Sequence, residues 1–124
     1  MTSIQPVLTC RNASAAVEFY ERAFGATELS RATNPSGVVA EMGIDDALFI
    51  VVDEVPEAFD LSPQTLGGTS VRIHLLVEDP DAVAAQAIAE GATEVFPIAD
   101  QPYGLRQGRL EDPFGHHWLI GRPL

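Results

Sequence analysis

The sequence predicts an α+β fold made of two tandem βαβββ modules with the helices on the outside. Two observations predict it. The tetrapeptide Gly-Ala-Thr-Glu occurs at residues 25–28 and again at 91–94, and around each copy one helical segment is followed by three strand-like segments. In such a module the helix covers one face of the strands and leaves the other face open. Two open faces that turn toward one another enclose a cavity.

The first module is predicted at residues 1–54 and begins with a strand at 3–10. Residues 13–24 form a helix, because four apolar side chains recur there at helical spacing: Ala16, Val17, Tyr20 and Phe24. Asn12 is a suitable N-cap, and Gly25 ends the helix. Further strands are expected at 27–31, 37–44 and 47–53.

The second module is predicted at residues 70–124, after a connector at 55–69 that contains two prolines, a Gly pair and no sustained periodicity. A strand at 71–77 precedes a helix at 80–90, which Asp79 or Asp81 caps and Gly91 ends. Strands follow at 94–98, 105–110 and 117–121. The tetrapeptide Asp-Pro-Phe-Gly at 112–115 is typical of a tight turn.

Composition limits the class of protein. A chain of 124 residues that is 46% hydrophobic is large enough for one domain with its own core. Its formal charge of −11 repels phosphate backbones and anionic membrane surfaces, so neither nucleic acid nor a membrane is an expected partner. The single Cys10 forms no internal disulfide and is expected to be a small buried hydrophobe. A cytoplasmic location is expected.

Three segments carry a resemblance to a known family: "AAVEFYERAFGA" in the first helix, "VEDPDAVAAQAIAEGA" in the second, and "GRLEDPFGHHW" before the last strand. Over essentially its whole length the chain resembles the glyoxalase/bleomycin resistance/dioxygenase superfamily, also called vicinal oxygen chelate proteins, and within it the branch named after the phosphonate-operon protein PhnB. The resemblance implies a curved, barrel-like mixed sheet and a homodimer. It is specific for fold and does not name a substrate.

Catalytic members of this superfamily hold a divalent metal with His, Gln or Glu side chains from the first and last strands of each module. On this sequence Gln5 suits one ligand position, whereas the other three fall on Arg72, Leu119 and a residue near Phe49. A guanidinium has no lone pair for a metal and repels a cation. We therefore expect no cofactor, with a divalent metal ion held through a different register as the alternative.

The alternation of side chains supports this assignment of faces. Along residues 71–77 the apolar set Val71, Ile73, Leu75 and Val77 suits the helix side, which places Arg72, His74 and Leu76 toward the cavity. Likewise Trp118 and Ile120 are expected to pack against the helix, while His117, Leu119 and Gly121 point inward.

The inward side chains predict a small-molecule site. Arg72, His74 and Gln5 together suit a carboxylate, phosphate or enolate oxygen. The full set of expected ligand-binding residues is Gln5, Val7, Thr9, Phe49, Arg72, His74, Tyr103 and Leu119, with Val51 and Leu76 as further apolar walls. By the resemblance, Tyr103 lies at the cavity mouth. Two alternatives stay open: Arg72 pairs with a carboxylate such as Glu41, and Tyr103 is an ordinary loop aromatic.

The neighbouring histidines have different expectations. His116 belongs to the turn and is expected to be solvated or to cap it. His117 is placed to reach the cavity rim, where a metal cluster with Gln5, His74 and Glu41 or Glu111 is the less favoured alternative.

Two functional classes follow. The first is a metal-free protein of the bleomycin-resistance kind that binds a small anionic or aromatic compound. The second is a metal-dependent lyase, isomerase or dioxygenase. The residues favour the metal-free class, so we expect a binding protein rather than an enzyme.

Overall fold

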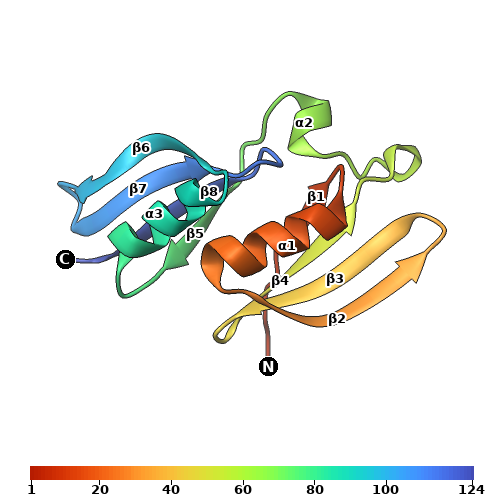
Figure 1. Ribbon diagram of the computed structural model, residues 1–124, viewed down its shortest axis with the longest axis horizontal. Coiled ribbons are helices and arrows are strands. Elements are labelled where there is room, and N and C mark those ends of the chain that lie inside the picture. The colour runs from red at the N-terminus through yellow and green to blue at the C-terminus, as the bar shows by residue number, and fades with distance from the viewer.

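The computed structural model describes residues 1–124, which form two four-stranded sheets next to one another (Figure 1). The first sheet has the strand order β1-β4-β3-β2, and the second repeats it as β5-β8-β7-β6. In each sheet the first strand pairs parallel with the last strand of its module, and the remaining pairs are antiparallel. The predicted α+β fold of two βαβββ modules is confirmed.

The first module consists of β1 (Val7–Cys10), α1 (Ala13–Phe24), β2 (Thr27–Asn34), β3 (Gly37–Ile44) and β4 (Ala47–Asp53). The bounds predicted for the helix and the last two strands are confirmed. β1 is shorter than expected, because Pro6 just before it has no N–H to donate to a neighbouring strand, and only its carbonyl pairs, with the N–H of Ile50. β2 extends to Asn34, beyond the expected end at residue 31, and so reaches the turn that leads into β3.

The sequence signals at both ends of α1 act as predicted. The Asn12 carboxamide accepts from the N–H of Ala15 at 3.0 Å. Gly25 adopts a left-handed φ of 67°, and its N–H donates to Glu21 in the last helical turn.

The second module consists of β5 (Arg72–Leu76), α3 (Pro80–Ala89), β6 (Thr93–Asp100), β7 (Leu105–Glu111) and β8 (His117–Pro123). Asp79, one of the two candidate caps, accepts from the N–H of Ala82 at 3.1 Å. Asp81 instead pairs with Arg106 of β7 at 2.8 Å.

The connector has a 3-10 turn at Pro56–Ala58 and a short helix, α2 (Pro63–Leu66). The three α-helices are all too short or too polar to cross a membrane.

One core joins the two modules. α1 packs on β1, β3 and β4, α3 packs on the second sheet, and the two helices contact each other (Figure 1). Aromatic rings cross the junction: the centroid of Trp118 on β8 lies 4.6 Å from that of Phe24 and 5.4 Å from that of Tyr20, both on α1. Because both helix layers meet in this core, the helix-free face of each sheet is left to solvent within one chain.

Candidate ligand-binding site

The helix-free face of the second sheet carries most of its polar side chains. Residues paired across a sheet point to the same side. β5 pairs Arg72 with His117 and His74 with Leu119 of β8, which in turn pairs Leu119 with Arg109 and Gly121 with Gln107 of β7. These side chains therefore share one face, opposite the buried Leu75, Trp118 and Ile120. The predicted facing of β5 and β8 is confirmed.

A hollow of about 370 Å³ lies on this face. Three of the predicted ligand-binding residues line it: Arg72, Tyr103 and Leu119. Four further lining residues that the sequence argument did not select supply an aromatic ring, two amides and a second cation: Phe96, Gln101, Gln107 and Arg109. Chemically, this hollow offers two positive charges, carboxamide groups and apolar walls in one place.

The two cations in the hollow lack a carboxylate partner. The chain has no lysine and seven arginines against eighteen acidic residues. Four of those arginines form ion pairs with Asp or Glu: Arg11, Arg22, Arg31 and Arg106. Arg72 forms none, so the open alternative of an Arg72–Glu41 pair does not occur within one chain. Arg109 donates only through its Nε, to His117. Two guanidiniums without a carboxylate partner in one hollow are chemically able to hold an anion.

Two hydrogen-bond chains order the side chains of the hollow. The Tyr103 hydroxyl donates to the Gln107 Oε1 at 2.6 Å, and the Gln107 Nε2 lies 3.1 Å from the His74 Nε2. The Gln107 Nε2 can donate to the His74 Nε2 only when the His74 proton is on Nδ1, because Nε2 then has a free lone pair. Tyr103 is thus tied to the sheet by its hydroxyl.

The second chain runs along β7 and β8. The Arg109 Nε donates to the His117 Nδ1 at 3.0 Å, and the His117 Nε2 lies 3.0 Å from the Glu111 Oε1. His117 is therefore committed to Arg109 and Glu111.

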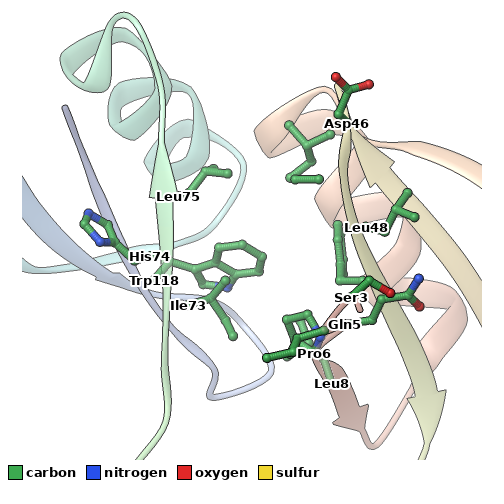
Figure 2. A pocket seen from close by; sticks show the side chains of 14 residues that line it. Ser3, Gln5, Pro6, Leu8, Asp46, Leu48, Ile73, His74, Leu75 and Trp118 are labelled. Carbon is green, nitrogen blue, oxygen red and sulfur yellow. The ribbon is translucent and has the colours of Figure 1, made fainter. Parts of the chain in front are cut away.

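A second hollow is the cleft between the modules (Figure 2). Gln5, Phe49 and His74 contribute to its lining, which is mostly apolar. In Figure 2 the His74 imidazole lies on the side of β5 away from Ile73 and Leu75, and the Gln5 carboxamide points away from β5. Within one chain the predicted grouping of Gln5, Arg72 and His74 around one point is therefore not formed.

Val7 and Thr9 line a third hollow, on the helix-free face of the first sheet. β1 pairs Val7 with Ile50 and Thr9 with Val52. The prediction that Phe49 and Val51 share this face is wrong, because β4 is shifted by one residue from the assumed register. Phe49 and Val51 are 4% and 0% exposed on the helix side, and Phe49 packs edge-on against Tyr20.

The residues do not fit the metal centre of catalytic relatives. The four corresponding positions carry an amide at Gln5, a guanidinium at Arg72 and hydrocarbon at Leu119 and beside Phe49. Across the whole chain no three His, Cys, Asp or Glu side chains gather closely enough to hold a metal ion. His116, assigned to the turn, places its Nε2 2.8 Å from the Thr9 carbonyl and so links the two modules.

Two of the four further lining residues, Gln107 and Arg109, follow a pattern that is visible in the sequence. In residues 105–111 Leu110 is apolar and buried, and the alternate positions Gln107, Arg109 and Glu111 are all polar. Period-two alternation on this strand places those three on the open face.

The chain is similar to a family model described as a glyoxalase-like domain, which matches residues 5–120. An uncharacterized protein of Mycobacterium tuberculosis (strain H37Rv) is 40% identical over 127 residues, covering 98% of this chain and 75% of the relative.

Solved structures are similar over the full length. The At5g48480 gene product from Arabidopsis thaliana is 27% identical with a TM-score of 0.74, covering 96% of this chain and 97% of its own. TioX from Micromonospora sp. ML1 is also 27% identical, with a TM-score of 0.76 and coverage of 99% and 97%. A glyoxalase family protein from Bacillus cereus, at 15% identity, TM-score 0.79 and coverage of 100% and 95%, shows the shared fold alone.

Proposed function

Because the chain belongs to the glyoxalase/bleomycin resistance/dioxygenase superfamily, we propose that it is a binding protein for a small anionic or aromatic compound and needs no metal ion. The observation that carries this proposal is the pair of guanidiniums, Arg72 and Arg109, that line one hollow without a carboxylate partner. Membership of the PhnB-like branch stays a prediction.

The surroundings of the two arginines suit a planar ligand. Phe96 and Tyr103 are 59% and 63% exposed, so each offers a ring face that a ligand can cover. Leu119, on β8 between β5 and β7, adds an apolar side chain to the same lining. Small-molecule pockets commonly bind the flat, apolar part of a ligand with aromatic and aliphatic side chains and its charged end with a few polar groups.

The metal-free part of the proposal rests on the donor chemistry. A divalent ion on this face would lie beside Arg72 and Arg109, and their positive charge raises its electrostatic energy. An anionic ligand, by contrast, is attracted by both guanidiniums. The alternative function, a metal-dependent lyase, isomerase or dioxygenase, needs donors that this face does not gather.

We further propose that two copies of the chain complete the cavity. The helix-free face of the first sheet is largely apolar: Val7, Val39 and Leu48 are 56%, 38% and 38% exposed, and Glu41, paired with Ile50, supplies a carboxylate. The helix-free face of the second sheet supplies Arg72 and Arg109. The two faces are complementary in charge, and each leaves apolar surface that a partner would bury. Placing the first sheet of one copy over the second sheet of another covers both.

A thermal-shift screen tests the proposed function. Purified protein is dialysed against a chelator and heated with aromatic carboxylates, each matched with its uncharged amide. A ligand at a hundredfold excess over its Kd stabilises the folded state by about 2.7 kcal/mol. We expect carboxylates to raise the Tm and the amides to raise it less, with Arg72→Gln reducing the difference and the Arg72→Gln/Arg109→Gln double variant abolishing it.

Elemental analysis of the purified protein tests the alternative, a metal-dependent enzyme. One equivalent of bound Ni, Zn, Mn or Fe per chain, lost when Gln5 or His74 is replaced, would favour the metal-dependent enzyme over the binding protein.

A further inference from the structure

We propose that His117 is a positioning residue that aims Arg109 at the carboxylate of the ligand, so that Arg109 binds this group end-on through Nη1 and Nη2. The inference rests on the proposed function and deepens it. It names the ligand class, a planar carboxylate, and says which atoms of Arg109 bind it.

The hydrogen bond between Arg109 and His117 engages one of the three guanidinium nitrogens and leaves the other two free to bind a ligand. Arg109 Nε donates to the His117 Nδ1 at 3.0 Å. Neither Nη1 nor Nη2 of Arg109 hydrogen-bonds or forms an ion pair within the chain, and Arg109 lines the hollow. A guanidinium has two edges that match a carboxylate: Nε with one Nη, or the two Nη groups together. With Nε engaged, the remaining edge is the Nη1–Nη2 end.

Glu111 fixes the tautomer that this arrangement needs. The His117 Nε2 lies 3.0 Å from the Glu111 Oε1, and a carboxylate accepts hydrogen bonds, so the His117 proton is on Nε2. Nδ1 then has a lone pair for Arg109. The order carboxylate, imidazole, guanidinium is the kind of oriented chain in which one group sets the position of the next.

The charges around His117 support the same tautomer. Arg72 pairs with His117 across β5 and β8, and Arg109 and Glu111 face it from β7. Two cations and one anion surround the ring, and a proton added at Nδ1 would meet the guanidinium of Arg109. His117 therefore accepts through Nδ1, which lets it hold Arg109 without placing a carboxylate directly against the guanidinium.

Calorimetric titration with benzoate, and with benzamide as its uncharged analogue, tests the inference on the full chain. His117→Phe keeps a ring but removes both nitrogens. His117→Asn keeps an acceptor at the place of Nδ1. We expect His117→Phe to weaken benzoate binding about tenfold, the effect of one displaced charge-assisted contact, and to leave benzamide unchanged. His117→Asn should restore most of the benzoate affinity.

Two controls keep the outcomes separate. Arg109→Gln removes the proposed ligand contact itself, and Arg122→Gln removes an arginine of β8 whose side chain hydrogen-bonds only to the neighbouring Pro123 carbonyl. Far-ultraviolet circular dichroism and Tm confirm that each variant is folded. In addition, long-range ¹H–¹⁵N spectra should show His117 protonated on Nε2 alone.

The inference is overturned, with the proposed function intact, if Arg109→Gln weakens benzoate binding while His117→Phe does not. It is also overturned if His117→Asn is as weak as His117→Phe, or if the proton resides on Nδ1. If neither Arg109→Gln nor Arg72→Gln changes benzoate binding, or if the wild type binds no benzoate, the proposed anion site falls and the inference with it.

Discussion

The hydroxyl of Tyr20 on α1 donates to the carboxylate of Asp112, 92 residues away in the turn between β7 and β8, at 2.5 Å. The same carboxylate accepts from the Trp118 Nε1 at 2.9 Å and from the backbone N–H groups of Phe114 and His116 at 2.9 and 3.0 Å. Asp112 is 3% exposed, and four donors satisfy it. This buried group links the helix of the first module to the turn that leads into the site-bearing strand of the second.

The first prediction concerns this link. Tyr20→Phe removes one donor and should lower the free energy of unfolding by about 1.5–3 kcal/mol, the range for a hydrogen bond to a charged group. Asp112→Asn should cost more, because its NH₂ group then faces donors that need an acceptor. Urea unfolding followed by Trp118 fluorescence measures both. Equal stability of Asp112→Asn and the wild type would contradict the assigned network.

The second prediction concerns alkaline pH. Burial, followed by the negative charges of Asp112 and Asp53, raises the pKa of the Cys10 thiol well above its usual value of 9.0. Burial, with Asp112 again second, raises the pKa of Tyr20 well above 10.0. Above about pH 9 the unfolded chain therefore loses protons that the folded chain keeps.

The unfolded state then binds fewer protons, so stability falls as pH rises. The slope should be about 1.4 kcal/mol per pH unit for each group, with Cys10 contributing first and Tyr20 adding above about pH 10. Lysine is absent and cannot mask the effect. Urea unfolding between pH 8 and 10.5 checks this, and Cys10→Ala should remove the part that starts near pH 9. An unchanged slope in Cys10→Ala would refute that assignment.

The third prediction concerns the bulge that places Phe96 beside Arg109. The β6–β7 register shifts on both sides of Phe96, and a Cβ at Gly108 would lie 2.7 Å from the Ile98 N and 2.8 Å from the Phe96 O. Gly108→Ala should therefore destabilise the fold by about 1–3 kcal/mol. It should also weaken benzoate binding.

Gly25→Ala is the matched control. Its φ of 67° makes alanine strained, but nothing lies within 4 Å of the added Cβ. We expect a loss of about 1 kcal/mol with benzoate binding intact. Thermal unfolding and titration of both variants separate a general loss of stability from displacement of the hollow.

The fourth prediction concerns the proposed homodimer. Val39→Arg places a positive charge on the helix-free face of the first sheet, where the second copy would present Arg72 and Arg109, and should shift the protein toward monomer in sedimentation velocity. Ile88→Arg alters an α3 residue of similar exposure, 40% against 38%, and should leave the dimer intact. The reverse pattern would place the interface on the helices, and a wild-type monomer at all concentrations would contradict the dimer.

Local sequence signals predicted the elements of this fold well. Asn12 and Gly25 bound α1, and the second Gly-Ala-Thr-Glu copy located the end of α3, because caps and terminators act within a few residues. The facing of β5 and β8 followed from clean alternation. The facing of β4 did not, since residues 47–52 are continuously apolar and alternation carries no information in such a run.

The candidate site was only partly predictable. Strand position placed Arg72 and Leu119 on one open face, and the family resemblance placed Tyr103 near it. The expected meeting of Gln5 with Arg72 depends on how two modules are arranged, which no local pattern specifies. Arg109 shares with Arg72 a place in the hollow and the lack of a carboxylate partner, and this combination appears only when all ion pairs and the lining of the hollow are known.

The most direct measurement is a calorimetric titration of chelator-treated protein with benzoate, comparing the wild type with the Arg72→Gln/Arg109→Gln double variant. We expect the wild type to bind without added metal, and the double variant to lose at least about a hundredfold in affinity, since each of the two charge-assisted contacts contributes about 1.5–3 kcal/mol. Equal affinity in the two proteins, or binding that appears only after a divalent metal is added, would contradict a metal-free anion site built on the two arginines.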